Sequence, residues 1–323
     1  MNFKKCILIL AGEPNSIFFE IFFKSIEKVK SKYPMVDIVY INILKLQMKE
    51  IKNKKKIRVL DEKYLNSYNL DNEFINLIDI DYSSNKAFGR ITNKSNIYIK
   101  ECFKMAFKII KKNKIKKLIT GPINKKTFLD KKFLGITEYI SKKFKKKNSV
   151  MLIYNEKLSV CPLTTHLPLK RVSKMISKNE IIEKVDLVNK FYKNSLNISP
   201  KIAVLGLNPH CESVDKFNED EKIILPAVKY LKKKRYNIYG PISADTIFLK
   251  NNRNKFDIII GMYHDQVLGP IKTLFEYDAI NVTLGLPFQR VSPDHGPNEN
   301  MLGKNISNPL SLIKAIKFLN KID

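Results

Sequence analysis

The sequence is short of histidine, tryptophan and paired cysteines, and each shortage excludes a class of protein. It has no tryptophan, and only four histidines and four cysteines occur among its 323 residues. The cysteines are scattered without a CxxC pair, which argues against a disulfide framework or a structural zinc knuckle and favours a reducing, cytoplasmic environment. No apolar run approaches the roughly 20 residues of a membrane-spanning helix, so we expect no membrane partner.

Acidic residues are also few relative to basic ones. The chain carries 59 Lys and Arg against 31 Asp and Glu, a formal charge of +28. Such a balance attracts nucleic acid, anionic membranes or anionic small molecules. However, lysine far outnumbers arginine, and no RNP-like or zinc-finger pattern occurs. We therefore interpret the charge mainly as solvated, lysine-rich helix faces and expect no specific nucleic-acid partner.

Short apolar runs alternate with longer segments of helical periodicity. This alternation predicts an α/β protein with a mostly parallel sheet covered by helices. The predicted strands are residues 6–10, 36–43, 117–120, 150–154, 158–163, 201–207, 256–262 and 279–284. The predicted helices are residues 16–30, 95–112, 178–194, 220–234 and 309–320, and residues 52–87 are expected to be rich in loops.

All four histidines follow predicted strands. They are His166 in TTHLPL, His210 in LGLNPH, His264 in GMYHDQ and His295 in SPDHGP. Ligands of parallel α/β folds bind where strands end, so this distribution favours a chemical role over a structural one. Three such imidazoles could converge on a divalent metal such as zinc. Asp245 and Asp265 are plausible carboxylates for the same site, with helix capping as the alternative.

Other residues are candidates for binding an anion. Residues 120–125, TGPINK, follow a strand and offer backbone N–H groups, a hydroxyl and the Lys125 ammonium in one place. Lys272, Asn281 and Arg290 interrupt an otherwise apolar stretch. Together with a neighbouring metal, they predict a small anionic substrate.

The ordered motifs LITGPINK, TTHLPL, LGLNPH, GPISADTIF, GMYHDQ and NVTLGLPFQRVSPDHG identify a family resemblance. The chain resembles the 4-hydroxythreonine-4-phosphate dehydrogenases of pyridoxal phosphate (pyridoxine) biosynthesis over nearly its whole length. The closing segment DHGPNENMLGKN is similar to the cofactor loop of isocitrate and isopropylmalate dehydrogenases, whose fold this family shares. The resemblance implies a two-lobed α/β/α architecture. Residues 1–121 plus 270–323 would form the cofactor-side lobe, and residues 122–269 the metal-binding and dimerisation lobe.

The resemblance also implies an activity. NAD or NADP would oxidise 4-phosphooxy-L-threonine to 2-amino-3-oxo-4-phosphooxybutanoate, which decarboxylates to 3-amino-2-oxopropyl phosphate. A divalent metal (zinc, magnesium or cobalt) would stabilise the negative charge that develops on oxygen. A homodimer is expected, with the second subunit contributing a metal ligand.

The family's functional positions fall on particular residues of this chain. The metal ligands match His166, His210 and His264, and the substrate-binding positions match Thr137, Lys272, Asn281 and Arg290. We expect Asp245, Asp265 and Lys272 to take part in catalysis. His295, Gly296 and Asn305 belong to the expected cofactor loop.

Three departures from the family pattern leave alternatives open. Ile136 stands where the family has a histidine, residues 15–20 replace a glycine-rich turn, and residues 213–215 replace glycines after His210. Isoleucine can neither bind phosphate nor carry a proton. The chain could therefore oxidise another phosphorylated hydroxy acid, such as a phosphothreonate. It could also be a non-catalytic relative that binds a phosphorylated metabolite or, through its lysines, nucleic acid.

Overall fold

The computed structural model describes residues 3–84, 86–124, 128–129, 133, 135–146 and 148–322. The chain forms two compact units, Met1–Phe133 with Pro287–Asp323 and Leu134–Leu286. Both boundaries lie later in the chain than the expected limits of 121 and 270. The second shift has a clear cause, because Pro270 lies inside helix α11 (His264–Phe275), which packs on strands of the second unit.

The first unit is built on a wholly parallel set of strands. Their order is β3 (Ile57–Val59), β4 (Ile75–Asp79), β2 (Met35–Val39), β1 (Ile7–Leu10), β5 (Lys117–Thr120) and β12 (Gln289–Pro293). Strands β1 and β5 are buried along their whole length. This is expected for central parallel strands with helices on both faces, and it explains their continuous apolar character.

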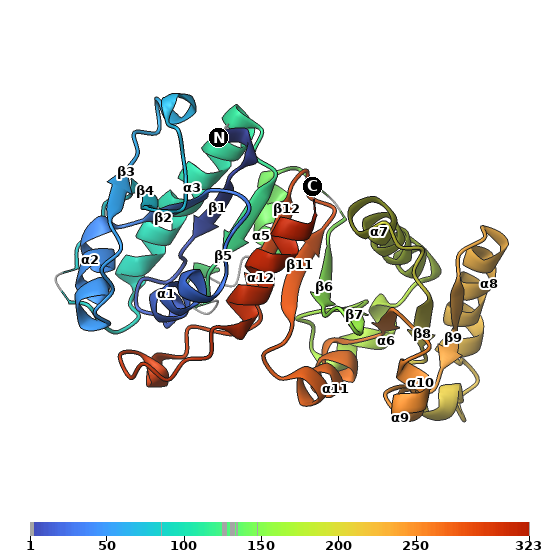
Figure 1. The fold of residues 1–323 in the computed structure, drawn as a ribbon. Helices are drawn as coiled ribbons and strands as arrows, with labels where there is room; N and C mark the ends of the chain where they lie inside the picture. Colours follow the sequence, from blue (N-terminus) through green and yellow to red (C-terminus); the bar gives the residue numbers. More distant parts are fainter. Residues whose placement is uncertain are drawn as a thin grey trace. The chain divides into compact units, whose positions relative to one another are not determined.

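Within the part of the chain that the structure describes, four helices cover this sheet. They are α1 (Phe18–Lys28), α2 (Ile41–Glu50), α3 (Asn93–Asn113) and α12 (Leu310–Lys321). Helix α3 packs on β1 and β2, while α1 and α12 pack against each other, with α12 also on β12 (Figure 1). Four phenylalanines of α1 are buried: Phe18, Phe19, Phe22 and Phe23. Their burial supplies much of the apolar contact on that face.

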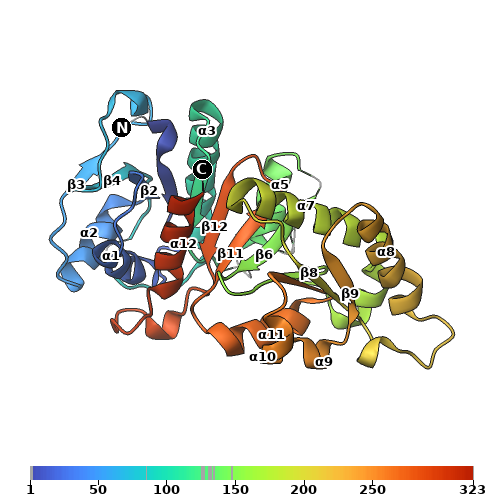
Figure 2. The same ribbon diagram turned by 45° about the vertical axis from the view of Figure 1, so that its right-hand side comes forward.

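The second unit has a mixed set of strands. Their order is β11 (Ile280–Leu284), β6 (Val150–Tyr154), β7 (Ser159–Pro162), β10 (Ile258–Gly261), β8 (Ile202–Leu205) and β9 (Ile238–Ile242). The pairs β11·β6 and β6·β7 are antiparallel, and the other pairs are parallel. Helix α7 packs on α8, and α11 packs on β7 and β10 (Figure 2). The helices are α5 (Ile136–Lys143), α6 (Val172–Met175), α7 (Lys178–Leu196), α8 (Leu225–Lys233), α9 (Ala244–Ile247), α10 (Lys250–Arg253) and α11.

The predicted α/β class with a mostly parallel sheet is confirmed, and one local prediction is wrong. Residues 52–87 are rich in loops, as predicted, although they also contain β3 and β4, which are short enough to show little periodicity. The strand predicted over residues 36–43 stops at Val39, because the Ile41 N–H donates to Asp79 Oδ1 over 2.8 Å and α2 begins there. None of the described helices is long and apolar enough to cross a membrane. All four cysteines are free thiols.

Candidate active site

The three predicted metal ligands follow three strands that are neighbours in the second unit. His166 comes after β7, His210 after β8 and His264 after β10, and the strand order is β7, β10, β8. These strands run parallel, so their carboxyl ends meet at one edge of the sheet. The fold therefore carries all three imidazoles to the edge where such folds bind ligands.

His166 and His264 lie close together. Their ring centroids are 5.8 Å apart. The two loops are tied by Thr164, whose backbone N–H and side-chain hydroxyl both donate to Met262 O, over 3.2 and 2.8 Å. The pairing of the two rings thus follows from hydrogen bonds made earlier in each loop.

The side chain of Gln266 holds the loop that carries His264. Its Oε1 accepts from Met262 N over 2.6 Å, and its Nε2 donates to Gly206 O at the end of β8 over 2.8 Å. His264 Nδ1 lies 2.6 Å from Asp265 Oδ1, and both residues belong to the first turn of α11. Sequence reasoning missed Gln266, although it lies within GMYHDQ, because its importance depends on β8 being adjacent in space.

His210 is paired differently. Its Nδ1 lies 3.9 Å from Asp245 Oδ2, and both side chains are largely exposed. The Ser243 hydroxyl donates to Asp245 Oδ1 over 2.5 Å; this hydrogen bond lowers the pKa of Asp245, and His210 lowers it further. The buried Asp220 carboxylate orders the His210 loop by accepting from the N–H groups of Leu207 and Asn208.

The single chain therefore brings the predicted ligands together as two pairs. His166 lies with His264, and His210 lies with Asp245. Within the described part of the chain, no three His, Cys, Asp or Glu side chains lie close enough to hold a metal ion together.

A glycine and a carboxylate adjoin His166. A Cβ atom added at Gly135 would lie 2.7 Å from Glu138 Oε2 and 3.0 Å from His166 Nδ1, so a larger residue would require these side chains to shift. The Thr165 hydroxyl donates to Glu138 Oε1 over 3.4 Å. Glu138 and His166 are thus neighbours across Gly135, which a motif alone could not establish.

Of the predicted substrate ligands, three belong to the second unit. The Thr137 and Thr283 hydroxyl oxygens are 3.4 Å apart, and Thr283 is on the same face of β11 as Asn281. Lys272 is exposed in the last turn of α11. The structure thus joins Thr137 to the β11 face, while Lys272 comes from a separate element.

Arg290, the fourth predicted substrate ligand, belongs to the first unit. It is 4% exposed, and its Nε and Nη2 donate to the Thr120 hydroxyl over 2.9 and 2.6 Å. Thr120 ends β5, so the guanidinium reaches the carboxyl edge of that sheet. Lys125, the other cation of the TGPINK segment, lies outside the described residues.

The predicted cofactor loop is anchored to α1. Lys24 Nζ donates to Asn305 O over 2.9 Å, and Glu20 Oε1 accepts from Ser307 N over 2.6 Å. His295 and Gly296 lie at the start of the loop, where His295 Nδ1 is 2.9 Å from Gly296 O.

Glu13 is a buried acid that sequence reasoning did not assign. It follows β1 and is 0% exposed, and burial raises its pKa from 4.5 to about 7 despite a 2.9 Å hydrogen bond from Ser95. Its backbone N–H donates to Pro122 O over 2.9 Å. A carboxylate three residues after the end of an apolar strand was the available signal.

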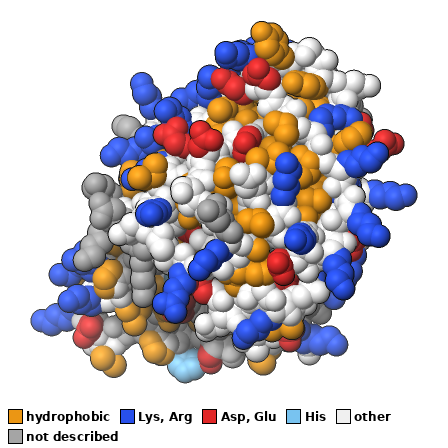
Figure 3. Space-filling model, turned by 90° about the vertical axis from the view of Figure 1, so that its left-hand side faces the viewer, with side chains coloured by type: hydrophobic (Ala, Val, Ile, Leu, Met, Phe, Trp, Pro, Cys, Tyr) orange, Lys and Arg blue, Asp and Glu red, His pale blue; other side chains and the backbone are white. Residues whose placement is uncertain are grey.

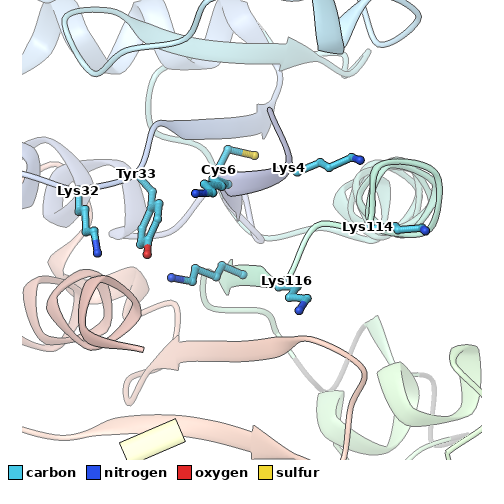
Figure 4. Close-up of a pocket in the computed structure, with 8 residues that line it drawn as sticks. Lys4, Cys6, Lys32, Tyr33, Lys114 and Lys116 are labelled. Carbon is cyan, nitrogen blue, oxygen red and sulfur yellow. The ribbon is translucent and has the colours of Figure 1, made fainter. Parts of the chain in front are cut away.

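A lysine-lined cavity at the opposite edge of the first unit has a structural explanation. Its volume is about 650 Å³, and it is lined by Lys4, Lys5, Cys6, Lys32, Tyr33, Lys114, Lys116 and Lys117 (Figure 4). Lys117 Nζ donates to Leu319 O and Ile322 O over 2.7 and 2.5 Å, and it lies 3.6 Å from the Tyr33 ring centroid. Lys117 thus meets the carbonyl end of α12, where positive charge is favourable without any ligand. On the face drawn in Figure 3, basic side chains are scattered among acidic and apolar ones.

Comparison with known proteins identifies the family. The family model of the pyridoxal phosphate biosynthetic protein PdxA matches residues 27–319. This chain belongs to the PdxA family. A 4-hydroxythreonine-4-phosphate dehydrogenase of Sulfurihydrogenibium sp. (strain YO3AOP1) is 38% identical, with 96% of each chain covered. A D-threonate 4-phosphate dehydrogenase of Pectobacterium atrosepticum is 30% identical, over 75% of this chain and 76% of the relative. The crystal structure of a 4-hydroxythreonine-4-phosphate dehydrogenase from Klebsiella pneumoniae has a TM-score of 0.82 at 26% identity, with 98% of each chain covered.

One departure from the PdxA family pattern has a structural consequence. Ile136 begins α5 and is 8% exposed, so its side chain belongs to the core of the second unit. The neighbouring Thr137 is half-buried and reaches Thr283. In this chain the hydroxyl of Thr137, rather than the side chain at position 136, is the polar group that this turn presents.

Proposed function

We propose that this protein uses NAD or NADP to oxidise the hydroxyl group of 4-phosphooxy-L-threonine. The product, 2-amino-3-oxo-4-phosphooxybutanoate, loses carbon dioxide to give 3-amino-2-oxopropyl phosphate in pyridoxal phosphate biosynthesis. The observation that carries the proposal is the pairing of His166 with His264 at the carboxyl ends of β7 and β10. This pair occurs in a chain whose curated relatives are named as dehydrogenases of this substrate.

The donor groups suit a divalent metal. His166 and His264 offer two imidazoles, and His210 offers a third beside the Asp245 carboxylate. Imidazole donors favour zinc or cobalt over magnesium. Such an ion supplies a Lewis acid that stabilises negative charge on the substrate oxygen. Because one chain holds these donors as two pairs, we propose that a second copy completes the ligand set in a homodimer.

The polar residues take distinct roles in this proposal. Arg290 and Lys272 bind anionic groups of the substrate, and Thr137 and Asn281 orient it by hydrogen bonds. Lys272 also carries a proton during the reaction. Asp265 and Asp245 hold the His264 and His210 rings in a fixed orientation, as carboxylates beside ligand histidines commonly do.

The first unit is proposed to bind the nicotinamide cofactor. The segment with His295, Gly296 and Asn305 is held on α1 by Lys24 and Glu20. A loop anchored in this way can position the cofactor without losing much entropy on binding. The protein then orients the nicotinamide, which carries out the redox step.

A second candidate substrate is D-threonate 4-phosphate. The specific observation is that Ile136 is packed in the core, where the family has a histidine. A relative named for that activity is 30% identical to this chain. The two substrates differ in the group next to the carboxylate, a hydroxyl in place of an amine.

Reduced cofactor formation, measured by absorbance, tests both candidates. Purified protein is stripped with a chelator, reloaded with zinc, cobalt or magnesium, and supplied with each substrate and with NAD or NADP. The proposal expects turnover of 4-phosphooxy-L-threonine only after metal is restored, with zinc or cobalt exceeding magnesium. Faster turnover of D-threonate 4-phosphate would transfer the proposal to that substrate. No turnover of either by metal-loaded protein would favour a non-catalytic relative.

A further inference from the structure

Strand register places Arg290 and Thr120 on the same face of the first unit's sheet. In the parallel pair β12·β5, Arg290 is the partner of Leu118. Thr120 is two residues beyond Leu118, and residues two apart in a strand share a face. The long arginine side chain leans along its strand and so reaches the level of Thr120. Two residues 170 positions apart in the sequence are thereby brought into contact.

A single oxygen accepts both hydrogen bonds. Arg290 Nε and Nη2 approach the Thr120 hydroxyl at 2.9 and 2.6 Å, and both residues are almost completely buried. A hydroxyl oxygen has two lone pairs, so it can accept from both N–H groups of one guanidinium edge. These contacts fix the plane of the guanidinium.

The backbone that carries Thr120 is itself rigid. The next residue, Gly121, donates to Leu10 O over 2.7 Å. A Cβ atom at Gly121 would lie 2.1 Å from Ala11 O, so no larger residue fits this turn. The hydroxyl of Thr120 is therefore presented from a turn that cannot shift without breaking the contact of β5 with β1.

We propose that Thr120 is a positioning residue, which holds the guanidinium of Arg290 in the orientation that binds an oxyanion of the substrate. The inference rests on the proposed function and deepens it, because it names what orients the substrate-binding arginine. The ligand chemistry is a planar or tetrahedral oxyanion, either the substrate's carboxylate or its phosphate. Both match the fork of N–H donors that an oriented guanidinium presents.

Two substitutions at position 120 separate positioning from a general structural role. Thr120→Val keeps the shape and the strand preference but removes the acceptor, and Thr120→Ser keeps the acceptor. Hydrogen bonds to charged groups typically change equilibrium constants by about ten- to a hundredfold. Thr120→Val should raise KM by ~10- to 100-fold while kcat changes by less than about threefold, the pattern of lost uniform binding. Thr120→Ser should restore KM to within a few-fold of the wild type.

Binding of inorganic anions gives a readout that does not depend on activity. Inorganic phosphate and, separately, acetate are titrated against the thermal unfolding of the wild type, Thr120→Val and Arg290→Lys. We expect stabilisation by at least one anion, weakened to a similar extent in both variants and in the double variant. A response to phosphate alone identifies the phosphate group as the ligand, and a response to acetate identifies the carboxylate.

Several outcomes would overturn the inference. These are a Thr120→Ser variant as impaired as Thr120→Val, a loss of kcat with unchanged KM, or fully additive effects of Thr120→Val and Arg290→Lys. If Thr120→Val does not fold, Thr120→Ala carries the same predictions. If wild-type protein turns over neither substrate, the proposed function fails, while anion binding still decides the role of Thr120.

Discussion

At the carboxyl ends of their strands, the two units differ in how far the polar side chains are hydrogen-bonded to one another within the single chain. In the first unit, Arg290 and Thr120 are buried and joined by two short hydrogen bonds on a rigid turn. In the second unit, the predicted metal ligands form two separate pairs, and His210 and Asp245 are largely exposed. One edge is organised by the fold of a single chain. At the other edge, no three His, Cys, Asp or Glu side chains of the described residues lie close enough to hold an ion together.

The difference follows from the energetics of each kind of group. A buried guanidinium must be hydrogen-bonded in the folded chain, because an unsatisfied buried charge would cost several kcal/mol. Exposed imidazoles and carboxylates are solvated by water and carry no such requirement. Under the proposed function, a metal ion or a second copy would supply the remaining order at the histidine edge.

The largest expected effect is at the histidine edge. His264→Ala removes one of two neighbouring imidazoles, so we expect bound zinc to be lost and turnover to fall by more than ~100-fold, since even residues behind metal ligands matter by 10- to 100-fold. Metal content by mass spectrometry and turnover measure this. Thr273→Ala, an exposed change on the same helix, should alter neither. Unchanged metal content in His264→Ala would remove this residue from the ligand set.

A second expected effect is at the first unit's edge and depends on pH. Because burial raises the pKa of Glu13 from 4.5 to about 7, the folded state holds this proton more tightly than the unfolded state. Its effect on stability is therefore absent below pH 4.5 and becomes increasingly unfavourable as the pH rises towards 7.

Glu13→Gln should remove that penalty. At pH 8 the variant should be more stable than the wild type by up to about 3 kcal/mol, and the two should converge near pH 4. Denaturant unfolding across this pH range measures the difference. Glu101→Gln, on the exposed surface of α3, serves as the control. Parallel pH profiles for wild type and Glu13→Gln would show that Glu13 titrates normally.

A smaller effect is expected at the lysine-lined cavity. It tests whether the polar groups at the opposite edge of the first unit's sheet are also satisfied within the chain, without a ligand. Lys117→Met keeps the aliphatic stem but removes the donor to Leu319 O and Ile322 O. We expect a loss of about 2 kcal/mol, with faster hydrogen exchange at the end of α12. Added inorganic phosphate should not stabilise the wild type through this cavity, so its phosphate response should be the same in Lys117→Met. A phosphate response that disappears in this variant would make the cavity an anion site.

The smallest effect is the difference in zinc affinity expected between alanine substitutions at two glycines of the second unit. Gly135→Ala would press a methyl group on Glu138 and His166, whereas Gly269→Ala meets nothing within 4 Å. We expect Gly135→Ala to weaken zinc binding about tenfold by displacing the His166 ring. Gly269→Ala should leave zinc binding unchanged and stabilise α11 by about 0.5–1 kcal/mol. Calorimetric zinc titration of both variants checks the comparison, and equal affinities would mean that His166 tolerates displacement.

Much of the fold could be predicted from local patterns, because buried parallel strands are continuous apolar runs and surface helices have a clear period. Strands β3 and β4 escaped prediction, since β3 has only three residues and is partly exposed. The end of β2 depended on the Asp79 side chain, which lies 38 residues away from Ile41. A contact between residues so far apart in the sequence cannot be predicted from a short stretch of neighbouring residues.

The candidate site divides in the same way. The sequence by itself determined that His166, His210 and His264 stand after strands, because a histidine that follows an apolar run in an α/β pattern has few other places to go. Only the tertiary structure decided that His166 meets His264, since this depends on β10 lying beside β7. It also decided that Thr120 holds Arg290 and that Glu13 is buried with a raised pKa. Burial and contact between distant residues arise from packing, which no run of neighbouring residues encodes.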